Sequence, residues 1–214
     1  MREIEAALIT APVKQITMEA GVRLEPDILD GLVKARARET SGLAKNILDL
    51  LLANAGIADQ ENIPVCQDTG VAVVFIELGQ DVHINGDLEE AVQLGIQAGY
   101  AEGYLRKSVC DPITRVNTGT NTPAVIHTEL VPGEQMKISM LPKGCGSENM
   151  SGLTMLPPSA GIGGMQDFVV RQAVNAGPNP CPPLLIGVGM GGTFEKAALL
   201  AKKALIRPLG QPHP

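Results

Sequence analysis

The sequence predicts an α/β protein in which mixed β-sheets are flanked by helices, with a helical N-terminal segment. Three observations support this fold class. The first 60 residues place apolar side chains at helical spacing, later apolar runs are typical of buried strands, and the two kinds of segment alternate along the chain. A chain of 214 residues is long enough to bury a core, and we expect residues 1–214 to form one domain.

The helical N-terminal segment is predicted to contain two helices. The first is indicated by apolar side chains that recur at helical spacing, namely Ile28, Leu29, Leu32 and Val33. Ser41 is placed to cap the second helix, and residues 54–56 are expected to end it. The apolar positions of this second helix are Leu43, Ile47, Leu48, Leu51 and Leu52.

The strands and helices that follow are predicted in chain order. Residues 71–76 form an apolar run rich in β-branched side chains, which is typical of a strand buried on both faces. Asp87 and Glu90 form a capping pattern that opens a helix expected to reach Leu105. Further strands are expected over residues 123–131, 135–141 and 184–188, the first two joined at Pro132-Gly133, and helices over residues 168–176 and 194–206. Residues 208–214 have no periodicity and are expected to be frayed or a linker.

Composition excludes several classes of protein. A formal charge of −6, together with only three Phe, two Tyr and no Trp, argues against nucleic-acid binding. No segment approaches the roughly 20 consecutive apolar residues that a membrane span requires. The N-terminus carries acids where a signal peptide would carry bases, so we expect a cytoplasmic protein. Its four cysteines are then expected to be thiols or ligands rather than disulfides.

The strongest candidate site in the sequence is Cys-Gln-Asp-Thr-Gly at residues 66–70. A thiol followed by an amide and a carboxylate, at the start of an apolar strand, offers a ligand for a soft metal with an acid or base beside it. A second candidate ligand, Cys181, lies far along the chain between prolines. This separation excludes a compact zinc knuckle and suits a cluster held by thiolates from several loops.

Three glycine-rich segments allow more than one interpretation. Residues 117–123 and 143–149 are compatible with carboxylate binding through converging backbone N–H groups, and equally with ordinary turns. Residues 187–192 match the Gly-x-Gly-x-x-Gly pattern of dinucleotide-binding proteins. However, the acidic residue expected about 20 positions later is absent, and no second strand follows. Tight strand-to-helix packing, or an anion at the helix N-terminus, explains these glycines as well.

Taken in order, these motifs resemble the iron–sulfur hydro-lyase family of class I fumarate hydratases and L-tartrate dehydratases. The closest resemblance is to the separate alpha subunit of the two-subunit form. It is carried by residues 66–70, 104–106, 117–123, 143–149, 179–183 and 191–193, which span nearly the whole chain. The resemblance implies hydration of fumarate to malate, with tartrate dehydration as the sibling reaction. It also implies a dicarboxylate substrate and a beta subunit as partner.

The resemblance further implies a [4Fe-4S] cluster held by three cysteines, with one iron left open. Cys66 and Cys181 match two of these three ligands. The third ligand of the family lies in a Cys-His-Ala-like segment that this sequence does not contain, so the chain looks shortened at its C-terminal end. Cys110 and Cys145 do not match the third position and are interpreted as cysteines that do not bind the cluster.

The resemblance also implies roles for four other residues. Gln67 and Asp68 match the pair that contacts substrate, and Asp68 would take part in proton transfer, directly or through a base on the beta subunit. Arg106 matches the arginine that binds a substrate carboxylate, and Gly146 matches a glycine whose backbone touches substrate. Considered alone, Asp68 is better explained by a turn before Gly70, and Arg106 by a surface ion pair at a helix end; the shared order of the motifs is what favours the functional roles.

Two alternatives belong to different functional classes. One is a non-catalytic fragment, a folded α/β domain that lacks the third cluster ligand and binds a partner. The other is a nucleotide-binding domain, which the glycine pattern at residues 187–192 alone would support. Iron binding by the assembled protein distinguishes the enzyme from the fragment, and thermal stabilisation by NAD tests the nucleotide-binding domain.

Overall fold

The structure is a computed structural model that describes residues 2–211. These residues divide into two compact units. The first contains residues 2–143 together with 208–211, and the second contains residues 144–207. Helices alternate with parallel and antiparallel strand pairs along the chain, which confirms the predicted α/β class with mixed sheets. Within the described range, no helix combines the length and the apolar character needed to cross a membrane.

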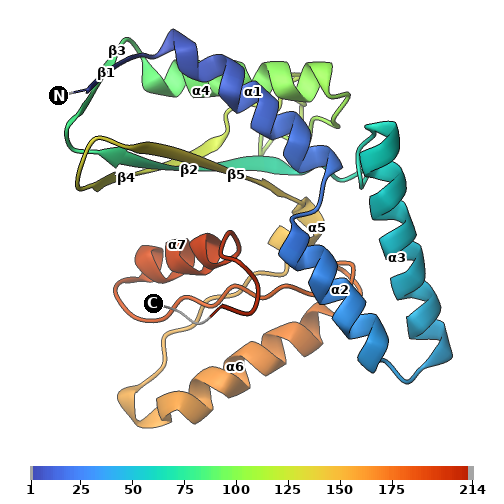
Figure 1. The fold of residues 1–214 in the computed structure, drawn as a ribbon. Helices are drawn as coiled ribbons and strands as arrows, with labels where there is room; N and C mark the ends of the chain where they lie inside the picture. Colours follow the sequence, from blue (N-terminus) through green and yellow to red (C-terminus); the bar gives the residue numbers. More distant parts are fainter. Residues whose placement is uncertain (1, 212–214) are drawn as a thin grey trace. The chain divides into compact units, whose positions relative to one another are not determined.

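A three-stranded mixed sheet forms the centre of the first unit (Figure 1). The central strand β2 (Val71–Gly79) pairs in parallel with β4 (Val125–Val131) and antiparallel with β5 (Met136–Lys143). The buried strand predicted at residues 71–76 is therefore confirmed, and it continues to Gly79. The strands predicted on either side of Pro132-Gly133 are also present, but they flank β2 rather than pair with each other.

The N-terminal segment begins with a strand, which the prediction of a purely helical segment missed. Strand β1 (Arg2–Glu5) pairs in parallel with β3 (Val82–Asn85). The side-chain nitrogen of Asn85 donates to the carboxylates of Glu3 and Glu5, at 3.3 and 2.9 Å. This short, charged strand contains no apolar run by which sequence analysis could recognise it. It is stabilised by pairing with β3, which lies far along the chain.

Helices α1 (Ala7–Val22) and α4 (Leu88–Glu102) lie side by side over one face of the central sheet (Figure 1). Their apolar side chains join alternate residues of β2 in one buried cluster, whose fully buried members include Val13, Val74, Ile76, Ile96 and Tyr100. Glycines on α4 let the two helices approach closely. A Cβ atom at Gly95 would lie 2.7 Å from Cβ of Val13, and one at Gly99 would lie 2.6 Å from Cβ of Thr17.

Helices α2 (Pro26–Arg38) and α3 (Gly42–Glu61) form an antiparallel pair. The predicted cap is present, since Oγ of Ser41 accepts the N–H of Ala44 at 3.4 Å. The prediction that the helix ends at residues 54–56 is wrong. Helix α3 continues to Glu61 and stops at Asn62, whose φ of 53° lies in the left-handed region. Asn and Gly disfavour a helix, Gly by about 1 kcal/mol relative to Ala, and here the packing of the buried residues Ala55 and Ala58 outweighs that preference.

The cap of α4 and the C-terminal segment complete the first unit. Oδ1 of Asp87 accepts the N–H of Glu90 at 2.9 Å, as the capping pattern predicts, and Leu105 lies just beyond the helix that was expected to include it. In the segment expected to be frayed, the N–H of Leu209 donates to the carboxylate of Asp27 on α2. The last part of that segment, residues 212–214, lies outside the described residues.

The second unit contains four helical segments. They are α5 (Cys145–Glu148), the 3₁₀ turn η1 (Pro158–Ala160), α6 (Gly161–Ala176) and α7 (Phe194–Ala204). The helices predicted at residues 168–176 and 194–206 are therefore present, and α6 begins earlier than predicted. The strand predicted at residues 184–188 is wrong, because this segment pairs with no other strand.

The segment that was expected to form this strand packs directly on α7. A Cβ atom at Gly187 would lie 2.1 Å from the carbonyl oxygen of Ala201, and one at Gly189 would lie 2.1 Å from that of Ala197. These two carbonyls lie one helical turn apart, so two alternate glycines bring the extended segment against the helix backbone. Close packing therefore explains the glycine pattern, which lacks the preceding strand that dinucleotide binding requires.

Candidate functional site

The loop at residues 66–70 connects α3 to β2 and carries three of the predicted site residues. Its shape is determined by two local hydrogen bonds. Sγ of Cys66 accepts the N–H of Asp68 at 3.4 Å, and Oδ1 of Asp68 accepts the N–H of Gly70 at 3.2 Å. Gly70 has a φ of 68°, a conformation that favours glycine. Asp68 thus forms the turn before Gly70 that was the structural alternative for this residue. The same turn holds its carboxylate in the loop that carries Cys66.

The side chain of Thr69 connects this loop to the segment that follows α4. Oγ1 of Thr69 donates to the carbonyl oxygen of Arg106 at 2.8 Å, and Thr69 is only 6% exposed. This bond places Arg106 next to the loop of Cys66 and Asp68. The Arg106 side chain is exposed, and no carboxylate of residues 2–211 pairs with its guanidinium. The alternative of a surface ion pair is therefore not realised within this range, and the guanidinium is open to a ligand carboxylate.

Tyr100, which sequence analysis did not identify as a site residue, supports the loop from the core. Its hydroxyl donates to the carbonyl oxygen of Thr69 at 2.7 Å and lies 3.2 Å from that of Gly70. Tyr100 is fully buried on α4. The signal that could have identified Tyr100 as a supporting residue is a hydroxyl on an otherwise apolar helix face, because a buried hydroxyl needs a hydrogen-bond partner.

Asn121 is the second supporting residue that sequence analysis missed. Its Nδ2 donates to the carbonyl oxygen of Gly70 at 3.1 Å, while its Oδ1 accepts the N–H groups of Ser108 and Val109 at 2.6 and 3.0 Å. The residue is fully buried and has a φ of 60°. One amide therefore joins the loop at residues 66–70 to the chain just after Arg106.

The loop at residues 117–123 was a candidate for carboxylate binding, but its amides are used to fold the chain. Nδ2 of Asn117 donates to the carbonyl oxygen of Lys107 at 3.0 Å, and its Oδ1 accepts the N–H of Gly119 at 2.7 Å. Asn121 is similarly occupied. These contacts correspond to the interpretation of the segment as a turn.

The second unit brings together the other two predicted site residues. A Cβ atom at Gly146, on α5, would lie 3.0 Å from the carbonyl oxygen of Asn179, which precedes Cys181 by two residues. The N–H of Cys181 donates to the carbonyl oxygen of Pro178 at 3.0 Å, and its φ is 56°. The backbone of Gly146 therefore lies against the loop that presents the Cys181 thiol.

Cys66 and Cys181 have the chemistry of soft-metal ligands. Both thiols are exposed and neither forms a disulfide, and the two residues belong to different units. The N–H of Asp68 donates to Sγ of Cys66 at 3.4 Å, which orients the sulfur within the loop. Among the residues that the structure describes, no group of three His, Cys, Asp or Glu side chains is gathered as a metal site. The chain thus offers two separate thiol donors that fit part of a cluster site.

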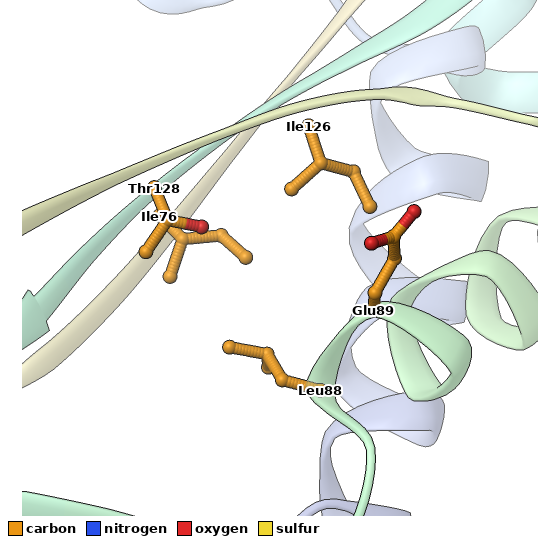
Figure 2. A pocket seen from close by; sticks show the side chains of 5 residues that line it. All are labelled: Ile76, Leu88, Glu89, Ile126 and Thr128. Carbon is orange, nitrogen blue, oxygen red and sulfur yellow. The ribbon is translucent and has the colours of Figure 1, made fainter.

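The first unit also contains a cavity of about 260 Å³, which is distinct from this candidate site. Figure 2 shows the residues that line it, which come from β2, β4 and the first turn of α4: Ile76, Leu88, Glu89, Ile126 and Thr128. The loop at residues 66–70 precedes β2, whereas Ile76 lies further along that strand. Arg106 follows the end of α4, whereas Glu89 lies at its start. Glu89 is the one charged residue among the described residues that line the cavity, so the cavity lacks the thiol and guanidinium of the candidate site. We therefore assign the site to the loops that carry Cys66, Asp68 and Arg106.

Comparison with known proteins matches nearly the whole chain to one group of proteins. The family model described as "Fumarate hydratase (Fumerase)" matches residues 10–214. A Methanocaldococcus jannaschii protein, named provisionally as L(+)-tartrate dehydratase subunit alpha, is 39% identical over 212 residues, covering 96% of this chain and 74% of that protein. The L(+)-tartrate dehydratase subunit alpha of Escherichia coli strain UTI89 is 31% identical over 210 residues, covering 96% and 69%.

Proposed function

The chain belongs to the fumarate hydratase family of iron–sulfur hydro-lyases, and we propose that it is the alpha subunit of an enzyme that reversibly hydrates fumarate to malate. The observation that carries this proposal is the position of Arg106. Its guanidinium is exposed and unpaired within residues 2–211, and its backbone is bound to the loop that carries Cys66 and Asp68. A cationic side chain whose backbone is joined to the loop of a thiol and a carboxylate suits a dicarboxylate substrate.

In this proposal, Arg106 binds one carboxylate of the substrate through two parallel hydrogen bonds. Gln67, which is exposed on the neighbouring loop, and the backbone of Gly146 provide further substrate contacts. Both relatives described above are named as alpha subunits, and we infer that a beta subunit completes the site. Groups on that subunit would neutralise the second carboxylate, so that negative charge at the reacting carbon is tolerated.

Cys66 and Cys181 would act as two of the three cysteine ligands of a [4Fe-4S] cluster. The third ligand matches no residue of this sequence. When bound, such a cluster supplies a Lewis acid that makes hydroxide easier to remove or to add. The hydrogen bond from the N–H of Asp68 supports the role of Cys66, since it holds Sγ in a defined position in the loop.

We assign proton transfer to Asp68. The substrate carbon that gains or loses a proton lies next to the carbon that bears the hydroxyl, so its acid or base must lie beside the metal ligands. Asp68 follows Cys66 by two residues, and its turn with Gly70 restricts the directions in which the carboxylate points. Asp68 would hold the proton itself or adjust a base on the beta subunit.

Dehydration of L(+)-tartrate is the second candidate function, and the names of the relatives favour it. Tartrate differs from malate by one additional hydroxyl. A site that hydrogen-bonds this hydroxyl discriminates strongly against the substrate that lacks it, because its buried polar groups are then left unpaired.

The test is made on the anaerobic enzyme assembled with its beta subunit. We expect kcat/KM for fumarate to exceed that for L(+)-tartrate by roughly a hundredfold. The opposite ratio would assign the tartrate reaction. Cys66→Ser and Cys181→Ser should each lose bound iron, while Cys110→Ser should retain it. An assembled protein that binds no iron and acts on neither substrate would favour the non-catalytic fragment and overturn the proposal.

A further inference from the structure

Helix α3 carries a row of exposed apolar side chains that the first unit leaves uncovered. Its inner face is buried at Leu48, Ala55 and Ala58, and Figure 1 shows α2 beside it. The exposed row consists of Leu43 (73% exposed), Ile47 (46%), Leu50 (69%) and Ile57 (53%). Single exposed apolar residues are common, but a continuous row along a helix is typical of an interaction surface.

The row is symmetric about Leu50 in both position and chemistry. At about 100° per residue, the seven positions 43, 46, 47, 50, 53, 54 and 57 fall within one third of the helix circumference, with Leu50 at the centre. Counting outward from Leu50, Ile47 matches Ala53, Asn46 matches Asn54 and Leu43 matches Ile57. Every matched pair is therefore either apolar with apolar or amide with amide, and none of the seven residues is charged.

The charged residues of α3 do not interrupt this row. Asp49 is paired with Arg36, and Asp59 with Arg23, so both aspartates are engaged within the chain. The first charged residue on the line of the row is Glu61, at the end of the helix. Two copies in parallel would bring their Glu61 carboxylates together, whereas an antiparallel pair holds them at opposite ends.

We propose that the outer face of α3 is a two-fold contact with a second copy of this chain, with the two α3 helices antiparallel. Leu50 of each copy would lie at the axis, and Leu43 of one copy would face Ile57 of the other. The spacings of three and four residues are those of a helix–helix seam. A two-fold contact must be self-complementary, whereas an unrelated partner would require no symmetry in α3. The symmetry therefore selects a second copy over the beta subunit as occupant.

The amides give the contact its register. Nδ2 of Asn54 donates to the carbonyl oxygen of Val65 at 2.8 Å, which orients the side chain. Its Oδ1 is then available to the side-chain amide of Asn46 in the second copy. An amide pair within an apolar seam specifies register, because a shifted pairing would leave these groups unpaired.

The first test measures dimerisation by sedimentation equilibrium, with Leu50→Glu as the variant. This change removes an apolar side chain from each copy and places two carboxylates at the axis, so the dimer dissociation constant should rise by roughly a hundredfold. The matched control is Leu8→Glu, because Leu8 on α1 is also 69% exposed and lies outside the row. Circular dichroism establishes that both variants are folded.

The second test uses introduced cysteines and peptide mapping to identify the cross-link. Mixing Leu43→Cys protein with Ile57→Cys protein should give a disulfide between positions 43 and 57, while Leu43→Cys protein alone should give none between its own copies. A 43-to-43 cross-link would show parallel pairing and overturn the proposal. A chain that stays monomeric, a dimer unaffected by Leu50→Glu, or a loss of the beta subunit in that variant would also overturn it.

Discussion

The phenol oxygen of Tyr100 lies 2.7 Å from the carbonyl oxygen of Thr69, so a fully buried hydroxyl on α4 supports the loop that carries Cys66. Thr69 in turn donates through Oγ1 to the carbonyl oxygen of Arg106 at 2.8 Å. The predicted metal ligand and the predicted carboxylate-binding residue are therefore positioned by one continuous set of hydrogen bonds. Disturbing the core end of this set should affect both.

We expect Tyr100→Phe to lower the free energy of unfolding by about 1 to 2 kcal/mol, because the change removes a buried hydrogen bond while keeping the ring. The loop should also loosen, so a thiol reagent should modify Cys66 faster. Urea unfolding and the rate of Cys66 modification measure the two effects. Tyr104→Phe is the control, since Tyr104 is 89% exposed. Equal modification rates in the two variants would contradict the supporting role of Tyr100.

Asn121 offers a test that separates hydrogen bonding from backbone conformation. Asn121→Ala loses three buried hydrogen bonds and should destabilise the protein by roughly 3 kcal/mol. Asn121→Gly loses the same bonds but accepts the φ of 60°, so it should be less destabilising by about 1 kcal/mol. Urea unfolding of both variants measures the difference. Equal stability would mean that the left-handed conformation is not retained.

The elements with a strong local signal were predicted well from the sequence. Ser41 and Asp87 both cap the helices expected of them, because a cap depends only on the next few residues. The run at residues 71–76 forms the central strand β2. The errors concern elements that depend on distant partners. Strand β1 exists through β3, and the apolar segment at residues 184–188 packs on α7 instead of joining a sheet.

The candidate site was only partly visible in the sequence for the same reason. Cys66, Gln67 and Asp68 form one short motif, and Arg106 and Gly146 were identified by resemblance. Tyr100 and Asn121 were not, because a buried tyrosine or asparagine has the same local sequence as many others, and only the fold shows which carbonyl it meets. The residues that support the candidate site are therefore harder to predict than the short motif at residues 66–68.

The close packing of α1 against α4 predicts opposite effects for two glycine substitutions. Gly99→Ala should destabilise the protein by about 1 to 3 kcal/mol, because the added Cβ would lie 2.6 Å from Cβ of Thr17. Gly56→Ala, on α3, should stabilise it by up to about 1 kcal/mol, because nothing lies within 4 Å and alanine favours a helix. Thermal unfolding compares the two variants. Stabilisation by Gly99→Ala would show that the helices are not this close.

The ion pair between α2 and α3 predicts a dependence on pH. Two hydrogen bonds from Arg36, at 2.9 and 3.0 Å, lower the pKa of Asp49 below its usual range. A lowered pKa in the folded state contributes stability above the unfolded pKa, and this stability is lost as the pH falls through the folded value. Below about pH 4, the melting temperature of the native chain should therefore fall more steeply than that of Asp49→Asn.

The reciprocal change at Arg36 tests the same pair. Arg36→Gln should reproduce the shallower pH dependence of Asp49→Asn, and combining the two should add little, because either change alone removes the interaction. Melting temperatures between pH 2 and pH 7, a range that spans the titration of aspartate, provide the comparison. Independent, additive effects would show that the two side chains do not stabilise the α2–α3 pair through each other.

Arg106 provides the sharpest test of how substrate binds. Its guanidinium is exposed, while its carbonyl oxygen is fixed by Thr69, so a side-chain substitution should leave the fold intact. In the assembled enzyme, Arg106→Ala should raise KM for the dicarboxylate by roughly a hundredfold, since a hydrogen-bonded charge pair contributes about 1.5 to 3 kcal/mol. Arg106→Lys should recover only part of this loss, because an ammonium cannot form the two parallel bonds of a guanidinium.

The iron content of the Arg106 variants separates substrate binding from damage to the metal centre. Both variants should retain as much iron as the native enzyme, because the hydrogen bond that joins Arg106 to the loop of Cys66 is made by its backbone carbonyl. Arg38→Ala, a change to an exposed arginine on α2, should leave KM and iron content unchanged. If Arg106→Ala also leaves KM unchanged, another cation binds the carboxylate, and the exposed guanidinium serves a purpose other than substrate binding.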